Sequence, residues 1–259
     1  MTHPFHVTTG DPASPVVLHV PHASRSLPPG ARSGLLISDA ELADELDHLT
    51  DAHTDRIAQL AAASASVRPW VLEHRWSRLA VDPERFPDDR EEMRAVGMGA
   101  VYTHGDAGRR LRDEDPVRDE AALRTHFRPY AAAVQDLVAD RLRACGRAVI
   151  LDVHSYSTLP LPYELHGASR RPAVCLGTDR FHTPPELISA AQAAFIDVAL
   201  DTPFAGCYVP LDFYRREPAV TALMSEIRRD GYMAEPGGPP SDGLTGLAAR
   251  LATLVDSVA

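Results

Sequence analysis

The sequence contains no lysine, an excess of acidic over basic residues and few cysteines, and the last two features exclude classes of protein. All 26 basic residues are arginine, and 36 acidic residues outnumber them, which gives a formal net charge of −10. A surface that binds nucleic-acid phosphates is basic, so we expect no nucleic-acid partner. Cys145, Cys175 and Cys207 lie far apart and form no Cys-x-x-Cys pair. They predict neither a disulfide framework nor a thiolate zinc site.

Long apolar runs are also absent. No stretch reaches the roughly 18 apolar residues that a membrane-spanning helix needs. The first residues, Met-Thr-His-Pro-Phe-His, lack the basic and apolar regions of a signal peptide. A composition of 44% hydrophobic and 24% charged residues is typical of a soluble globular protein. We therefore predict a reduced, soluble, cytoplasmic protein without a membrane partner, and the number of subunits stays open.

Short β-branched apolar runs alternate with longer helical patterns along the chain. This alternation predicts βαβ units around a mostly parallel sheet, and no repeat or long linker interrupts it. We therefore predict an α/β fold made of one domain over residues 1–259. Strands are expected near 16–20, 67–72, 78–82, 147–153, 172–177 and 220–227, and helices near 38–64, 117–144, 184–199 and 241–257.

Local signals indicate some helix starts and three long loops. Ser38 with Glu41 three residues later forms a capping box. Thr183 followed by Pro184 predicts an N-cap and a first helical residue. Three turn-rich stretches are long enough to be functional, and we expect them to gather over one edge of the sheet. They are residues 83–116, 155–171 and 201–219.

Two histidines end apolar runs: His22 after Val-Val-Leu-His-Val-Pro and His154 after Ala-Val-Ile-Leu-Asp-Val. Open α/β sheets assemble their sites at strand ends, and two imidazoles there are candidate zinc ligands. A strand-end histidine is also a common structural residue. Asp152 lies two residues before His154, on the same side of the strand, where it would orient the imidazole.

A third ligand is expected in the polar run Asp47-His-Leu-Thr-Asp-Ala-His-Thr-Asp55. Carboxylates and imidazoles both suit zinc, so the run offers several candidates, Asp51 among them. The alternative is a helix start, with Thr50 or Asp51 as the N-cap of the following segment. One residue of the run can bind a metal while another caps the helix.

Glu226 is a carboxylate inside the apolar run Ala222–Ile227. Burying a carboxylate is costly unless it is paired or functional. A catalytic zinc site keeps one position for water, and a nearby carboxylate takes the proton of that water. Glu226 is therefore a candidate general base, and the alternative is a strand-end residue that faces solvent.

Five motifs in order make the chain resemble the N-formylglutamate amidohydrolases, a branch of the zinc carboxypeptidase-like hydrolases. The likeness covers about residues 14–238. It implies a three-layer α/β/α sandwich around a mixed, mostly parallel sheet. The motifs are Pro-His22-Ala-Ser, Thr50-Asp51 with His53, Ser77-Arg78-Leu-Ala-Val-Asp82-Pro-Glu-Arg85, Asp152-Val-His154-Ser155 and Glu226-Ile-Arg-Arg-Asp-Gly-Tyr232-Met233.

The resemblance implies that His22, Asp51 and His154 bind one metal ion per chain, either Zn²⁺ or another divalent ion, and that Glu226 is the general base. Zinc carboxypeptidases take two ligands from a His-x-x-Glu pair, but here the position three after His22 is Arg25. Asp51 is the expected substitute. The 72-residue interval from His154 to Glu226 is similar to the interval between the last histidine and the catalytic glutamate of the carboxypeptidases.

Substrates of the family carry a carboxylate, which a guanidinium binds in bidentate geometry. By the resemblance, Arg85 would bind this carboxylate and stabilise charge during the reaction, and Arg78 would assist it. Tyr208 would hydrogen-bond the amide or its oxyanion. The alternatives are surface ion pairs for the two arginines and core packing for the tyrosine.

The chain departs from the family pattern at two places. The family usually has Asn-Arg where this chain has Glu84-Arg85, an acidic change beside the expected carboxylate clamp. The better-studied members also have an arginine in a Gly-Gly-(His/Tyr)-Ile-Thr-Arg pattern, and residues 206–214 contain none. A substrate with two carboxylates is therefore not assured.

The resulting expectation is a zinc-dependent amidohydrolase that cleaves the N-formyl or N-acyl amide of a small amino acid, as in N-formylglutamate plus water to glutamate plus formate. The alternatives are a metallo-carboxypeptidase or another N-acyl-amino-acid hydrolase on the same scaffold, and a catalytically silent carboxylate-binding protein. The chain has no Gly-x-Ser-x-Gly elbow of a serine hydrolase.

The sequence decides the role of only some of the other polar residues near the expected site. Glu164 and His166 lie in the loop after the His154 strand, and whether either joins the site stays open. Six further histidines are not expected to be ligands. They are His19, His48, His53, His74, His104 and His126.

Overall fold

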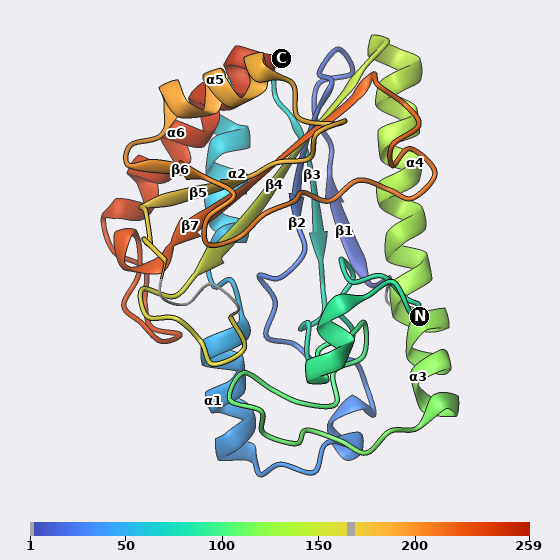
Figure 1. Cartoon of the computed structure of the whole chain (residues 1–259). Coiled ribbons are helices and arrows are strands. Elements are labelled where there is room, and N and C mark those ends of the chain that lie inside the picture. Colours follow the sequence, from blue (N-terminus) through green and yellow to red (C-terminus); the bar gives the residue numbers. More distant parts are fainter. Residues whose placement is uncertain (1–2, 165–168) are drawn as a thin grey trace.

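The computed structural model describes residues 3–164 and 169–259, and its centre is a seven-stranded sheet (Figure 1). Strands β3, β2, β4 and β7 run parallel, whereas β1 pairs antiparallel with β3, and β5 pairs antiparallel with β7 and parallel with β6. This mixed sheet confirms the predicted α/β fold. In spatial order the strands are β1 (Phe5–Thr8), β3 (Trp70–His74), β2 (Val16–Val20), β4 (Ala148–Tyr156), β7 (Val220–Arg228), β5 (Val174–Gly177) and β6 (Val198–Leu200).

Helices cover both faces of the sheet, which makes three layers (Figure 1). Helices α2, α5 and α6 pack on one face and α4 on the other, while α1 lies beyond the carboxyl ends of the parallel strands. No helix in the described ranges is both long and apolar enough to span a membrane. The helices are α1 (Asp39–Leu49), α2 (Thr54–Ser64), α3 (Pro116–Ala122), α4 (Arg128–Cys145), α5 (Pro185–Ala194) and α6 (Gly243–Val258), with one π-helical turn at Leu123–Phe127.

The strand pleat decides which face receives the polar residues of β4. Val149 and Leu151 pack into the core with α2 and α6, whereas Ile150 packs with α4. Because side chains alternate, Asp152 and His154 share the α4 side with Ile150. Burying a valine or leucine stabilises the fold by about 1.5–3 kcal/mol. A one-residue slip would lose this burial and turn both polar residues to the other face.

The helix predicted over 38–64 is two helices, and this prediction was wrong at the centre. The capping box of Ser38 and Glu41 is confirmed, but α1 ends at Leu49. The Asp51 backbone N–H donates to the carbonyl of His22 at 3.0 Å, and the Thr54 hydroxyl donates to the Asp51 carbonyl at 2.7 Å. These bonds replace the helical ladder. The N-cap of α2 is His53, not Thr50 or Asp51.

The strand predicted near 78–82 is also wrong, because this apolar run is buried within a loop. Leu79 packs against α1 and the loop of residues 83–116, and Val81 packs against Ala100 and Phe127. Burial of an apolar run therefore did not require a strand here. The short strands β1 and β6 were not predicted.

Two helix boundaries also differ from the prediction. Pro184, not Thr183, is the N-cap of α5, because the Thr183 hydroxyl donates to the Ala222 carbonyl at 2.7 Å instead. Helix α5 ends at Ala194, and part of the predicted range 184–199 forms β6.

Candidate active site

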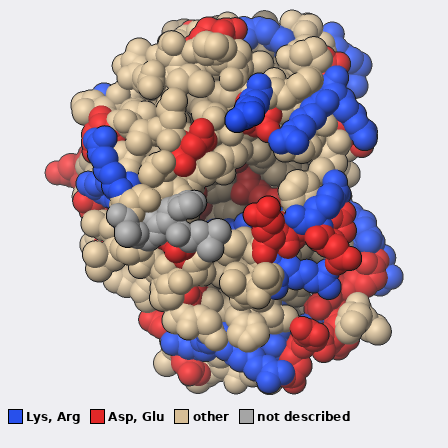
Figure 2. Space-filling model, in the orientation of Figure 1, with Lys and Arg blue, Asp and Glu red and all other residues tan. Residues whose placement is uncertain are grey.

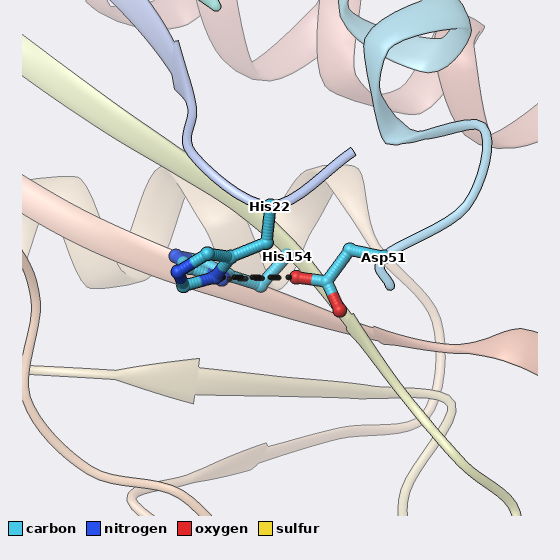
Figure 3. Close-up of side chains that lie close together, drawn as sticks. All are labelled: His22, Asp51 and His154. Atoms are coloured by element: carbon cyan, nitrogen blue, oxygen red, sulfur yellow. Dashed lines mark hydrogen bonds and ion pairs between the residues drawn. The ribbon is translucent and has the colours of Figure 1, made fainter. Parts of the chain in front are cut away.

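Three donor atoms from three separate segments meet at the carboxyl edge of the sheet (Figure 3). His22 follows β2, His154 lies on β4, and Asp51 occupies the break between α1 and α2. The Nδ1 atoms of the two histidines are 3.3 Å apart. Asp51 Oδ2 lies 3.2 Å from His154 Nδ1 and 3.7 Å from His22 Nδ1. All three side chains are buried.

The spacing of these donors fits a zinc ion. Zinc–nitrogen and zinc–oxygen bonds of about 2.0–2.1 Å in a tetrahedron place neighbouring ligand atoms about 3.3 Å apart. The three observed separations lie between 3.2 and 3.7 Å. Two imidazoles and one carboxylate are also a donor set that catalytic zinc sites use. The structure thus brings together the three residues that the sequence indicated.

The second ring nitrogen of His22 is held by Asp82. Asp82 Oδ1 lies 2.9 Å from His22 Nε2, which directs Nδ1 toward the centre of the three donors. Asp82 Oδ2 accepts from Arg78 Nη2 at 2.8 Å and from the Tyr102 hydroxyl at 2.6 Å. Burial alone would raise the pKa of Asp82, but the charges of Arg78 and His22 hold it well below its usual range. A carboxylate behind a ligand imidazole also strengthens that ligand.

Asp152 occupies the corresponding place behind His154. Its Oδ1 lies 3.0 Å from His154 Nε2 and accepts from His19 Nδ1 at 2.8 Å. The Tyr130 hydroxyl lies 2.6 Å from His19 Nε2, so a buried chain of polar groups runs from α4 to His154. Burial opposes ionisation of Asp152, yet His154 and His19 keep its pKa well below the usual range. The sequence did not indicate that His19 belongs to this series of polar groups.

Arg229 fixes the third donor, Asp51. Its Nη2 donates to Asp51 Oδ1 at 3.1 Å, and its Nη1 donates to the His48 carbonyl at 2.6 Å. Asp51 Oδ2 is thereby left to face the two histidines. Burial would raise the pKa of Asp51, but hydrogen bonds to His154 and His22 lower it far more. Arg229 was not singled out from the sequence, although it stands within the motif that begins at Glu226.

Glu226 lies directly beside His154, because β4 and β7 pair these two residues in register. Its Oε2 is buried and has no hydrogen-bond partner among the described residues. Burial raises the pKa of Glu226 to about 7, although the charge of His154 opposes the shift. A carboxyl group with such a pKa can both take and return a proton near neutral pH.

The two candidate substrate-binding arginines differ in the hydrogen bonds that they make to protein carboxylates. Arg78 uses Nε and Nη2 on Asp82, which leaves it committed to the support of His22. Arg85 lies 3.7 Å from Asp82 Oδ2 and 3.6 Å from Glu91 Oε1, both beyond hydrogen-bond distance. Its buried Nε has no partner in the described part of the chain. Of the two arginines, Arg85 is the one that lines the cavity and makes no side-chain hydrogen bond within the described residues, so it is better placed than Arg78 to bind a ligand carboxylate.

A cavity of about 850 Å³ opens beside the donors, and all three predicted loops contribute to its wall. Glu84, Arg85 and Asp152 line it together with Tyr163 and Tyr208. The space-filling view shows the hollow near the middle of this face, with acidic atoms inside it (Figure 2). Tyr208 stacks on His19 at a ring separation of 4.7 Å, and its backbone N–H donates to Asp152 Oδ2 at 3.3 Å.

Glu84 extends from the cavity wall to the histidines. Its Oε2 lies 3.2 Å from His154 Nε2 and 3.7 Å from His22 Nδ1, and its Oε1 lies 3.5 Å from His19 Nδ1. Oε1 is buried without a hydrogen-bond partner within the described ranges. The sequence marked Glu84 as a departure from the family but did not indicate that it reaches the metal donors.

Glu164 and His166 follow β4, and the sequence left open whether either joins the site. Glu164 is nearly buried and pairs with Arg171, whose Nη1 lies 2.5 Å from Glu164 Oε2, so it does not join the donors. His166 lies outside the described residues.

A comparison with known protein families gives a match over most of the chain. The family model described as FGase, N-formylglutamate amidohydrolase, matches residues 14–233. The chain belongs to this family. The resemblance drawn from the five motifs is therefore confirmed, and family membership supports an amidohydrolase function.

Two solved structures share the fold. An N-formylglutamate amidohydrolase from Ralstonia eutropha JMP134 is 21% identical with a TM-score of 0.81, over 98% of this chain and 96% of the other. The gene product Atu2144 from Agrobacterium tumefaciens is 19% identical with a TM-score of 0.69, over 99% and 93%. No curated protein matched the chain.

Proposed function

We propose that this chain is a zinc-dependent amidohydrolase that cleaves the N-formyl or N-acyl amide of a carboxylate-bearing amino acid. His22, Asp51 and His154 would hold the ion. The observation that carries the proposal is the convergence of three buried donor atoms 3.2–3.7 Å apart. When bound, zinc supplies Lewis-acid polarisation of the amide carbonyl and lowers the pKa of water.

In this proposal Glu226 moves the proton. Its unpartnered Oε2 takes a proton from the attacking water, whose oxygen forms a bond to the carbonyl carbon. Glu226 then passes the proton to the nitrogen as the carbon–nitrogen bond breaks. The immediate products are the amine and the carboxylic acid, and transfer of the acid proton to the amine gives an ammonium and a carboxylate, which is formate when the acyl group is formyl. The raised pKa of Glu226 suits both proton transfers.

Arg85 positions the substrate. Arg85 lines the cavity and its guanidinium makes no hydrogen bond in the described part of the chain, so it can bind a carboxylate in bidentate fashion. Holding the carboxylate fixes the scissile amide relative to Glu226 and the donor atoms, which lowers the entropic part of the barrier. Tyr208 lines the same cavity and would hydrogen-bond the amide.

The test is the variant Glu226→Gln, which keeps the shape of the side chain but cannot take a proton. Removing a general base is expected to lower kcat by about 10²–10⁴-fold, while the zinc content stays that of the wild type. Glu186→Gln, on the exposed surface of α5, is the matched control and should keep full activity. Full activity in Glu226→Gln, measured on N-formyl amino acids, would contradict the assigned base.

A further inference from the structure

The cavity beside the donors is larger than a small formyl amino acid requires. Its volume of about 850 Å³ lies near the upper end of the range of roughly 300–1,000 Å³ for cavities that hold drug-sized ligands. The three metal donors are almost fully buried, so the open space lies on the side of Arg85 and Tyr208. The extra volume is thus available to the amino-acid part of the amide rather than to its acyl group.

The wall of this space is largely apolar. Aromatic and aliphatic side chains come from two of the long loops, the π-helical turn and α4. Val96 and Leu211 are also exposed, with 46% and 42% of their surface accessible, so apolar area remains uncovered. Burying such area against a ligand is favourable. The apolar wall includes Phe86, Met93, Val96, Phe127, Ala131, Val209, Leu211 and Tyr214.

The charged residues of the cavity wall can bind one anionic group of a ligand. Among the arginines that line the described cavity, Arg90 pairs with Asp88 and Arg128 pairs with Glu120. Arg85 alone has no hydrogen bond to a protein carboxylate. At the inner end of the cavity lies the Glu84 carboxylate, whose Oε2 is 3.2 Å from His154 Nε2 and whose Oε1 has no hydrogen-bond partner within the described ranges. A second carboxylate on the ligand would therefore meet Glu84 instead of a free guanidinium.

We infer that the preferred substrate is the N-formyl derivative of an amino acid with one carboxylate and a large apolar or aromatic side chain, rather than a dicarboxylate. This inference rests on the proposed function. Arg85 binds the single carboxylate, the apolar wall receives the side chain, and Glu84 repels a second carboxylate. The bonds formed and broken are those of the proposed hydrolysis.

The first test compares substrates of the zinc-loaded full chain. We expect kcat/KM for N-formyl-L-phenylalanine and N-formyl-L-leucine to exceed that for N-formyl-L-glutamate by about tenfold or more, since pocket contacts of this kind commonly discriminate at that level. Equal or greater activity on N-formyl-L-glutamate would overturn the inference but keep the proposed function. Hydrolysis of none of the three would overturn the inference and the N-formyl part of the proposed function.

A binding measurement separates specificity from turnover. Calorimetric titration of the zinc-loaded Glu226→Gln variant should give a lower Kd for N-formyl-L-phenylalanine than for N-formyl-L-glutamate, because binding does not use the base. The opposite order would overturn the inference whatever the activity.

The second test places a guanidinium on the apolar wall. Leu211→Arg should raise kcat/KM for N-formyl-L-glutamate relative to N-formyl-L-phenylalanine by about tenfold or more. Leu200→Arg on β6 is a matched control, because Leu200 is 39% exposed and lies outside the cavity lining. It should leave the ratio unchanged. An unchanged ratio in Leu211→Arg, or an equal change in the control, would contradict the assigned wall.

Discussion

Each donor atom of the candidate metal centre is held by one charged neighbour, and that neighbour has partners of its own. Asp82 holds His22, Asp152 lies behind His154, and Arg229 holds Asp51. Hydrogen bonds thus fix the directions of His22 and Asp51 before any ion binds, and Asp152 Oδ1 lies 3.0 Å from His154 Nε2 on the far side of the ring. Preorganisation of this kind lowers the entropic cost of binding a metal.

Asp82 offers a direct test at the level of one atom. Asp82→Asn keeps the size of the side chain but removes the charge behind His22, so zinc affinity should fall by about 10–100-fold. Asp88→Asn, on the exposed part of the same loop, is the control and should bind zinc as the wild type does. Competition with a chromophoric chelator measures both. Unaltered affinity in Asp82→Asn would show that this contact does not tune the centre.

His74 is predicted to make the protein sensitive to acid. Both ring nitrogens are buried without hydrogen-bond partners among the described residues. Burial lowers the pKa of His74 to about 3, helped by the charge of His22. The unfolded chain protonates near pH 6.5, so the stability from neutral His74 is complete above that pH and is lost as pH falls toward 3.

His74→Leu should remove this loss. Between pH 6.5 and 5 the wild type is expected to lose about 1.6 kcal/mol of unfolding free energy through this residue. Urea unfolding at the two pH values should therefore show a smaller difference for His74→Leu. His6→Leu on the exposed side of β1 is the control and should keep the wild-type difference. If the unfolding free energy changed by the same amount between the two pH values in all three proteins, His74 would not be the source of the acid sensitivity.

At the scale of elements, the break between α1 and α2 is the feature that creates the third donor. Asp51 leaves the helical ladder because its N–H bonds to the carbonyl after β2 and its own carbonyl accepts from Thr54. The motif around Asp51 was visible in the sequence. The break was not, because half of its hydrogen bonding comes from His22, which is distant along the chain. Local periodicity contains no information on such a contact.

Thr54→Val tests the break. The variant removes the buried hydroxyl that supports Asp51, so it should cost about 1–3 kcal/mol of unfolding free energy and weaken zinc binding. Thr54→Ser keeps the hydroxyl and should retain most of the zinc affinity. Denaturant unfolding and chelator competition together give both quantities. Equal zinc affinity in the valine and serine variants would contradict a role for this hydrogen bond in positioning Asp51.

The strands and loops of the site show a second limit of sequence reasoning. The register that places Glu226 beside His154 follows from two buried strands, and both strands were predicted close to their observed bounds. The run at 79–81 was apolar enough for a strand but is buried in a loop. The approach of Glu84 to the histidines depends on that loop, so it was accessible only from the three-dimensional structure.

At the scale of the whole molecule, the parallel strands bring their carboxyl ends to one edge (Figure 1), and described residues of all three long loops line the cavity beside it. Five carboxylates gather there within a chain of net charge −10, and only some of them pair with arginine. A bound cation would offset their mutual repulsion. These carboxylates are Asp51, Asp82, Glu84, Asp152 and Glu226.

The zinc content of the purified chain tests the central claim most directly. The account predicts one zinc ion per wild-type chain by elemental analysis, and its loss in His22→Ala. His48→Ala is the matched control. His48 lies close to the centre in sequence, but its ring hydrogen-bonds to the Asp44 carbonyl within α1 and lies 3.8 Å from Asp106 Oδ2, so the variant should retain zinc. Stoichiometric zinc in His22→Ala, or none in a wild-type chain purified with zinc present, would contradict the proposed metal centre.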